Sequence, residues 1–160
     1  MRLAATAIGG YYPTPSGIVS DIVRGFEKPD ASTQVAILDP CAGKGEAVIQ
    51  FARGISTPRN SPKVYAIEME NRRHDALQEN LRNYGTYPQR FELHGDAFSV
   101  PLKTDSDNEG FSVLYLNPPY DTDKKFVRVE EKFLDRFTNT LMVGGVLVFI
   151  VPGYALSASA

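Results

Sequence analysis

Five short segments rich in apolar residues recur along this chain, and their alternation with amphipathic stretches constrains the fold more than any other feature. These segments are residues 34–38, 64–67, 90–94, 111–116 and 146–151. Each has the length of a strand, whereas the stretches between them repeat apolar residues at the spacing of helices. Strands that alternate with helices build a parallel sheet with right-handed crossovers. The sequence therefore predicts an α/β fold with a doubly wound parallel sheet.

The stretches between the predicted strands carry start and stop signals for helices. Thr14 is predicted to cap a helix that begins at Pro15, a second helix is predicted to follow Glu46, and Asn71 is predicted to cap the third. A further helix is expected over residues 126–142. Predicted ends are Gly85 and the glycine pair 144–145, because glycine commonly follows the last turn of a helix. Glu70, just before the third helix, is expected to be solvated.

Composition limits the class of protein. With 160 residues, 42% of them hydrophobic, residues 1–160 are expected to form one globular domain. Cys41 is the single cysteine and there are two histidines, so we expect neither a disulfide nor a metal. The sequence lacks both a membrane-length apolar run and a signal-peptide pattern, which predicts a soluble cytoplasmic protein with no membrane partner. The net charge of -2 gives no overall basic surface.

A glycine-rich turn joins the predicted strand 34–38 to the next helix. Its sequence is Asp39-Pro40-Cys41-Ala42-Gly43-Lys44-Gly45-Glu46. Glycines let the backbone approach a ligand and a helix N-terminus offers free N–H groups, so the turn is a candidate binding loop or else a plain turn. A phosphate-binding loop is excluded, because Lys44 is not followed by Ser or Thr. A dinucleotide dehydrogenase is disfavoured, because Val48 stands where a third glycine is needed.

Acidic residues follow the next two predicted strands. Glu68 lies 23 residues after Gly45, close to the distance at which nucleotide-binding α/β domains place a carboxylate that accepts from ribose. Asp96 follows the strand 90–94 and either meets a ligand or simply forms a turn after Gly95. Ligands of open α/β sheets bind at the C-terminal ends of the strands. Both carboxylates are therefore candidates for the same site.

The tetrapeptide Asn117-Pro118-Pro119-Tyr120 ends the predicted strand 111–116. Two prolines cannot continue a strand, so the chain must turn there into a rigid corner. The corner presents a side-chain amide, unpaired backbone carbonyls and an aromatic ring. An amide oxygen accepts hydrogen bonds but takes no proton, so Asn117 can hold a polar ligand without acting as a base.

The order of these segments resembles the class I S-adenosylmethionine-dependent methyltransferases, most closely the N6-adenine DNA methyltransferases, over roughly residues 10–152. Residues 39–45 look like the family's cofactor-binding glycine motif, and residues 117–120 match its catalytic tetrapeptide letter for letter. Residues 11–15, Tyr-Tyr-Pro-Thr-Pro, look like the N-terminal motif that closes over the methionine end of the cofactor. This motif order is similar to the gamma arrangement. With the two preceding glycines, it is also similar to uncharacterised methyltransferase-like proteins of phages and plasmids.

The resemblance implies S-adenosylmethionine as cofactor, a Rossmann-like sheet of order 3-2-1-4-5, and two sets of site residues. The implied cofactor-binding residues are Tyr12, Thr14, Pro15, Asp39, Cys41, Ala42, Gly43, Gly45, Glu68, Met69, Asp96, Ala97, Phe98 and Asn117. The implied catalytic residues are Asn117, Pro118, Pro119 and Tyr120. Asp96 would accept from the adenine of the cofactor and Glu68 from its ribose. Asn117 and the carbonyl of Pro118 would accept from the acceptor amino group, while Tyr120 stacks on the flipped base.

The implied function is methylation of adenine in DNA, as in restriction-modification. Lys124, Lys125 and Arg128 either meet phosphates beside the base or form a solvated helix face. Strand 146–151 would lie at an edge of the sheet, so the chain looks cut short. A C-terminal target-recognition region missing from this sequence, or a partner chain, is expected to cover it. Methylation of RNA or of a protein glutamine, and a non-catalytic cofactor-binding scaffold, remain as alternatives.

Overall fold

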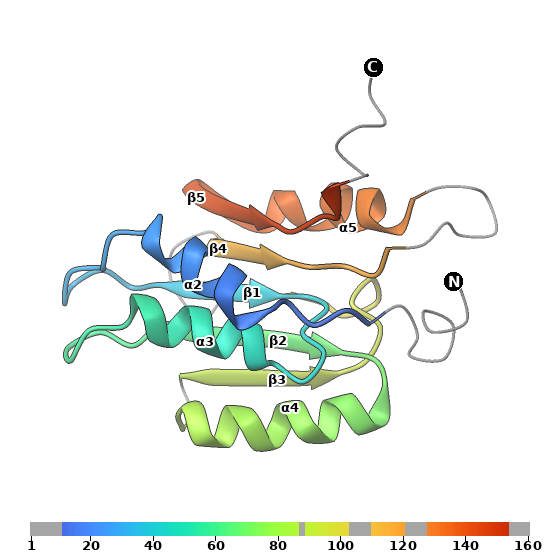
Figure 1. Ribbon diagram of the computed structural model, residues 1–160, viewed down its shortest axis with the longest axis horizontal. Helices are drawn as coiled ribbons and strands as arrows, with labels where there is room; N and C mark the ends of the chain where they lie inside the picture. Colours follow the sequence, from blue (N-terminus) through green and yellow to red (C-terminus); the bar gives the residue numbers. More distant parts are fainter. Residues whose placement is uncertain (1–10, 87–88, 103–109, 121–127, 154–160) are drawn as a thin grey trace.

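The computed structural model describes residues 11–86, 89–102, 110–120 and 128–153. The strands in these ranges are β1 (Ala36–Asp39), β2 (Lys63–Glu68), β3 (Arg90–His94), β4 (Phe111–Leu116) and β5 (Leu141–Phe149). Neighbouring strands pair in parallel, and their order is β3-β2-β1-β4-β5 (Figure 1). This order confirms the predicted Rossmann-like, doubly wound sheet.

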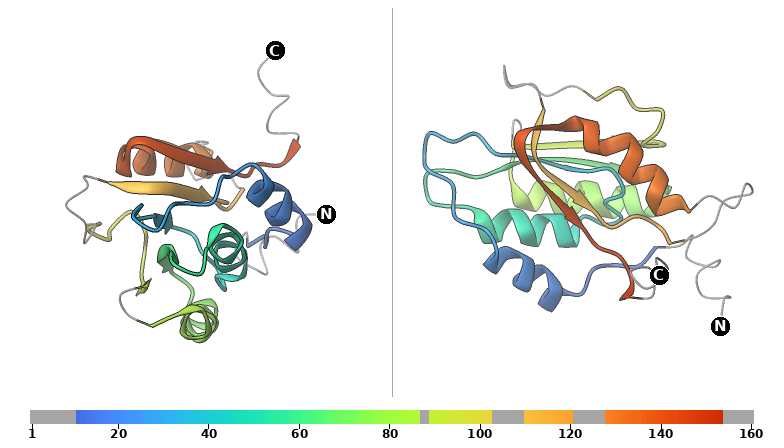
Figure 2. Two further views of the ribbon diagram at one scale, coloured as in Figure 1. Left: turned by 90° about the vertical axis from the view of Figure 1, so that its left-hand side faces the viewer. Right: turned by 90° about the horizontal axis from the view of Figure 1, so that it is seen from above.

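Helices cover both faces of the sheet. Their bounds are α2 (Ser16–Arg24), α3 (Glu46–Ile55), α4 (Asn71–Tyr84) and α5 (Val129–Phe137). The first three lie on one face and α5 lies on the other (Figure 2). None of the helices in the described ranges has the length and apolar character needed to cross a membrane.

Two hydrophobic cores lie on opposite faces of the sheet, because successive side chains of a strand point in opposite directions. Ile37 of β1 is buried beneath the helices α2, α3 and α4, whereas Leu38 is buried on the α5 side. In β4, Tyr115 is likewise buried on the side of α2, α3 and α4, and Leu116 is buried on the α5 side. Burial on both faces explains why these strands read as continuous apolar runs.

The predicted cap of α2 is wrong. The helix begins at Ser16 after Pro15, and no side chain caps its free N–H groups. The Thr14 hydroxyl instead accepts a hydrogen bond from the side-chain amide of Asn117 at 2.9 Å. A contact between distant parts of the chain therefore replaces the local cap that the sequence pattern favoured.

Glu70, and not Asn71, caps α4. Its carboxylate accepts from the backbone N–H groups of Arg72 at 3.1 Å and Arg73 at 2.9 Å. These hydrogen bonds, that of Arg73 foremost, lower the pKa of Glu70 below its usual value. The predicted end of the helix is confirmed, since the α-helix stops at Tyr84 and Gly85 follows it in an extended conformation.

The predicted boundaries of the last helix and strand are wrong. The helix α5 ends at Phe137, a short 3-10 helix follows over Thr138–Thr140, and β5 already begins at Leu141. Residues 126 and 127, where the helix was expected to begin, lie outside the described ranges. The glycine pair 144–145 therefore lies inside a strand and does not end a helix.

A bulge explains how the glycine pair fits inside β5. Phe111 pairs with Leu141 and Val113 pairs with Val146, so β5 advances five residues where β4 advances two. Gly144 has a φ of 80°, and a Cβ on Gly145 would lie 2.9 Å from the carbonyl oxygen of Met142. Only glycine suits both positions, because positive φ and close backbone approach exclude larger side chains.

Candidate active site

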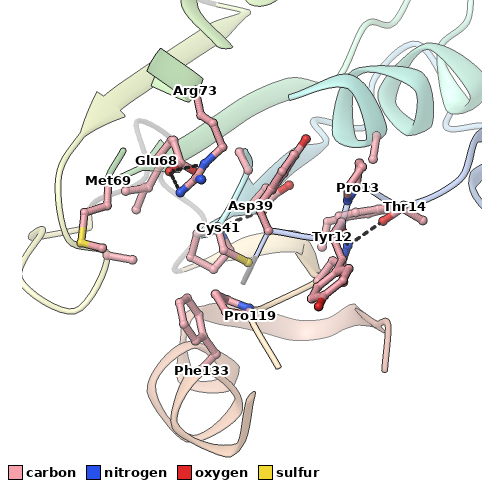
Figure 3. Close-up of a pocket in the computed structure, with 18 of the residues that line it drawn as sticks. Tyr12, Pro13, Thr14, Asp39, Cys41, Glu68, Met69, Arg73, Pro119 and Phe133 are labelled. Atoms are coloured by element: carbon pink, nitrogen blue, oxygen red, sulfur yellow. Dashed lines mark hydrogen bonds and ion pairs between the residues drawn. The ribbon is translucent and has the colours of Figure 1, made fainter. Parts of the chain in front are cut away.

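A cavity of about 280 Å³ opens at the C-terminal ends of β1, β2 and β4. Figure 3 shows Glu68 and Arg73 on one side of it and Tyr12 and Thr14 on the other. The predicted site residues that line the cavity are Tyr12, Thr14, Asp39, Cys41, Ala42, Glu68, Met69, Asp96, Ala97, Phe98, Asn117 and Pro119. Those that do not are Pro15, Gly43, Gly45, Pro118 and Tyr120. Separate segments thus meet at one edge of the sheet.

Two glycines shape the turn between β1 and α3. Gly43 has a φ of 57° and Gly45 a φ of 79°, so both occupy the left-handed region that favours glycine. A Cβ on Gly43 would lie 2.1 Å from a ring carbon of Tyr11, and a Cβ on Gly45 would lie 2.4 Å from Leu77. Both positions therefore need glycine for backbone conformation and for packing. Neither Gly43 nor Gly45 lines the cavity itself.

Asp39 and Cys41 lie at the base of this turn. The Asp39 carboxylate accepts from the backbone N–H of Cys41 at 3.1 Å and so fixes the direction in which the chain leaves β1. Burial raises the pKa of Asp39 to about 7, and the nearby charge of Glu68 adds to the shift. Burial also raises the pKa of the Cys41 thiol. Because only the thiolate is nucleophilic, Cys41 is suited to packing and not to reaction.

Glu68 ties the end of β2 to both neighbouring segments. One carboxylate oxygen accepts from the Gly43 N–H at 2.9 Å. The other accepts from the Glu70 N–H at 2.8 Å and from Arg73, whose Nε lies 3.0 Å away and whose terminal nitrogen forms an ion pair at 3.0 Å. A carboxylate offers about four lone-pair positions. The oxygen that meets Gly43 therefore keeps room for one further donor.

Tyr11 was predicted only as part of the N-terminal motif and Arg73 was not predicted as a site residue, yet both line the cavity. The Tyr11 ring packs on Gly43, and the Arg73 guanidinium lies 5.2 Å from the centre of that ring. The pair joins the N-terminal segment to the glycine turn and to Glu68. A usable signal was the position of Arg73 in the first turn of the helix that follows Glu68.

The third predicted segment also reaches the cavity. Asp96 accepts from the backbone N–H of Phe98 at 3.0 Å and from the Ser99 hydroxyl at 3.2 Å, so its carboxylate forms a turn as well as lining the cavity. Ala97 is buried, and the Phe98 ring meets Phe133 of α5 edge to face at 4.8 Å. α5 thereby closes this end of the cavity.

Asn117 stands where β4 ends, and its amide is held from two directions. The amide nitrogen donates to the backbone oxygen of Tyr12 at 2.8 Å and to the Thr14 hydroxyl at 2.9 Å. The Tyr120 hydroxyl hydrogen-bonds to the amide oxygen and also lies 2.6 Å from the carbonyl oxygen of Ile150. Because the nitrogen faces two acceptors, the orientation of the amide is fixed.

Of the three cationic residues considered for phosphate contact, only Arg128 lies in the described part of the chain. Arg128 pairs with Glu130 at 2.7 Å and lies 3.8 Å from Glu131, so its charge is balanced within α5 and its N-terminal edge. Lys124 and Lys125 lie outside the described residues. In the described part of the chain, no group of three or more His, Cys, Asp or Glu side chains is placed to hold a metal ion.

Comparison with known families decides the class. Over residues 1–159, the chain matches the uncharacterised methyltransferase family DUF6094. The chain belongs to this family. No curated protein matches it.

Solved structures share the fold of this family member at low identity. One is a proposed class I S-adenosylmethionine-dependent methyltransferase from Listeria monocytogenes, with a TM-score of 0.77, 15% identity, and coverage of 94% of this chain and 49% of that one. Another is a type I restriction-modification methyltransferase subunit from Streptococcus thermophilus, with a TM-score of 0.67, 17% identity, and coverage of 89% and 34%. A third, from Thiobacillus denitrificans, is an S-adenosylmethionine-dependent methyltransferase bound to S-adenosyl-L-homocysteine, with a TM-score of 0.53, 18% identity, and coverage of 88% and 48%. These likenesses establish the class I methyltransferase fold, and the chain spans a third to a half of each structure.

Proposed function

We propose that this protein transfers a methyl group from S-adenosylmethionine to the exocyclic amino group of adenine in DNA. The observation that carries the proposal is the fixed amide of Asn117, at the edge of a cavity formed by the ends of the parallel strands. Membership of a methyltransferase family and the class I fold support methyl transfer as the reaction. The adenine specificity rests on the tetrapeptide at residues 117–120.

The cavity has the chemistry that S-adenosylmethionine requires. The cofactor carries a nucleoside, an amino-acid end and a cationic sulfur, and when bound it supplies an activated methyl group. The carboxylates of Glu68 and Asp96 line the cavity and favour the positive charge and the donor groups of the cofactor. Met69 and Phe98 supply apolar surface for a purine ring. We assign Glu68 to the ribose through the carboxylate oxygen that has room for a further donor.

Asn117 acts by orienting the acceptor. The lone pair of an exocyclic amino group is delocalised into its ring, so the nitrogen is a poor nucleophile until its geometry changes. The amide oxygen of Asn117 and the carbonyl oxygen of Pro118 can each accept one amino hydrogen, which directs the lone pair toward the methyl group. Neither group takes the proton, so the amino nitrogen would lose one proton to solvent once it has gained the methyl group and S-adenosyl-L-homocysteine is left. Positioning of this kind can supply roughly 7–11 kcal/mol of the rate enhancement.

We also propose that a target-recognition region or a partner chain covers the edge of the sheet at β5. Val143 on this strand is fully exposed, and Val146 and Leu147 are partly exposed. A long apolar edge invites pairing with another chain unless it is covered. The structural neighbours, of which this chain spans a third to a half, have the length for such a region.

The test is a set of parallel reactions, each containing the protein, S-adenosylmethionine and one substrate: DNA, RNA or a glutamine-containing peptide. Mass spectrometry of the hydrolysed products is expected to detect N6-methyladenine from DNA. Calorimetry is expected to show one S-adenosylmethionine bound per chain. Absence of cofactor binding would refute the cofactor assignment, whereas methylglutamine or methylated RNA would redirect the substrate. Cofactor binding with no methylated product would favour a scaffold.

A further inference from the structure

A second cavity lies beside the cofactor cavity and shares walls with it. Its volume is about 380 Å³, and Tyr12, Pro13, Thr14 and Asn117 line both cavities. The remaining walls of the second cavity are Pro15, Tyr120, Ile150, Val151 and Pro152. Asn117, which the proposed reaction places against the acceptor, therefore stands at the junction of the two spaces. One cavity is assigned to the cofactor, which leaves the second for the acceptor.

Two of the residues that line this second cavity, Tyr12 and Tyr120, have neighbouring aromatic rings. The rings of Tyr12 and Tyr120 are inclined at 30° to each other, with their centres 6.2 Å apart. The rings of Tyr65 and Phe91, which are stacked directly, lie at 4.3 Å and 9°. A planar ring between two others needs about 7 Å, since carbon atoms in contact lie about 3.5 Å apart. The Tyr12 and Tyr120 rings would therefore have to move apart and become parallel to admit such a ring.

We propose that Tyr12 and Tyr120 form the two walls of a slot that binds the planar, amino-bearing ring of a nucleobase. The proposal rests on the proposed function and assigns to Tyr12 a contact with the acceptor, in addition to its place in the wall of the cofactor cavity. The segment before α2 thus supplies half of the acceptor site. Stacking on two faces favours an aromatic base over the smaller amide of a glutamine side chain.

Hydrogen bonds connect both tyrosines of this slot to the side chain of Asn117. The backbone oxygen of Tyr12 accepts from the Asn117 amide nitrogen, and the Tyr120 hydroxyl bonds to the amide oxygen. A ring held between the two tyrosines would therefore have its edge beside that amide oxygen. The Tyr120 hydroxyl has an alternative acceptor in the Ile150 carbonyl oxygen at 2.6 Å. It can therefore free a lone pair on Asn117 for the incoming amino group without losing its own partner.

The matched variants Tyr12→Ala and Tyr12→Phe test the slot. Both keep the backbone oxygen that holds Asn117, but only Tyr12→Phe keeps the ring. Loss of one stacking face is expected to raise the KM for adenine-containing DNA about ten-fold in Tyr12→Ala, and Tyr12→Phe is expected to stay within about two-fold of the wild type. The Kd for S-adenosylmethionine is measured by calorimetry in both variants, because Tyr12 also lines the cofactor cavity, and its increase in Tyr12→Ala is expected to be smaller than the increase in KM.

A binding measurement separates this inference from the proposed function. Adenosine is titrated into each protein saturated with S-adenosyl-L-homocysteine, so no methyl transfer is needed. Adenosine binding that is lost in Tyr12→Ala and kept in Tyr12→Phe supports the slot, even if the wild type makes no N6-methyladenine and the proposed function fails. The slot is overturned if the wild type binds no adenosine, if Tyr12→Ala binds it normally, or if Tyr12→Ala weakens cofactor and adenosine equally.

Discussion

At the scale of single residues, Asn117 is the side chain on which the proposed reaction depends. We expect Asn117→Ala to keep S-adenosylmethionine affinity within about two-fold, because this residue orients the acceptor. Methyl transfer is expected to fall about 10²–10³-fold, the usual loss when one preorganised polar contact is removed. Calorimetry and single-turnover rates measure the two effects. If cofactor binding disappeared while the circular dichroism spectrum stayed native, the assigned role would be wrong.

Thr14 holds the Asn117 amide through a single hydrogen bond of 2.9 Å, and this bond can be tested by itself. Thr14→Val keeps the shape of the side chain but removes the acceptor, leaving the Tyr12 backbone oxygen as the other partner of the amide nitrogen. A lost hydrogen bond of about 1 kcal/mol predicts a roughly five-fold lower rate of methyl transfer. Thr14→Ser restores the hydroxyl and is expected to restore the rate. Equal rates in the two variants would remove Thr14 from the positioning of Asn117.

Sequence patterns predict which residues reach the cavity only where the relevant contacts are local. Asn117 and Glu68 stand directly at strand ends, so their position at the cavity followed from the strand predictions. Arg73 sits in a polar helical stretch and reads as one more solvated charge. It reaches Glu68 only because α4 folds back against the end of β2. Thr14 was likewise predicted to cap a helix, because no residue near it in the sequence indicates that its partner is Asn117.

At the scale of elements, the turn between β1 and α3 depends on Gly45. Its φ of 79° is unfavourable for other residues, and a Cβ there would lie 2.4 Å from the buried Leu77 of α4. Gly45→Ala is expected to lower the free energy of unfolding by about 1–3 kcal/mol, through backbone strain and overpacking. Gly17→Ala is the matched control: a Cβ at Gly17 in α2 has open space around it, and helix propensity predicts a gain of about 0.5 kcal/mol. Urea denaturation of both variants measures the difference, and equal stabilities would contradict this role of Gly45.

The last helix and strand show what sequence patterns leave undecided about elements. A glycine pair ends helices and also occupies bulges in strands. The pairing of β5 with β4 selects the bulge, because Phe111 meets Leu141 ahead of the pair and Val113 meets Val146 just after it. That register is a contact between distant segments, which no local window contains. The strand 90–94 contains no glycine pair of this kind, and it was predicted with its observed bounds.

At the scale of the whole molecule, the sheet and its order were predictable because five strands alternate with helices and the motif order resembles a known family. Periodicity alone predicts a parallel sheet and leaves the strand order open. The order places the ends of β1, β2 and β4 side by side, so residues far apart in the sequence share one cavity. The same burial that assembles the site also places a carboxylate, Asp39, in the interior.

Asp39 should therefore make the stability of the whole molecule depend on pH. Burial raises its pKa from 3.8 to about 7, so the folded state holds a proton that the unfolded state has released between these values. Folding is then favoured most below about pH 4, and this contribution is lost as the pH rises to about 7. The loss is of order 4 kcal/mol.

Asp39→Asn isolates this effect, because an amide has no proton to lose and its oxygen can still accept from the Cys41 N–H. Relative to the wild type, the variant is expected to be about equally stable near pH 4 and progressively more stable up to about pH 7, with a constant advantage above that. Urea denaturation of both proteins from pH 4 to pH 8 gives the difference at each pH. A difference that did not change with pH would mean that Asp39 is ionised in the folded protein throughout, and that its charge is available to the cofactor cavity at every pH in that range.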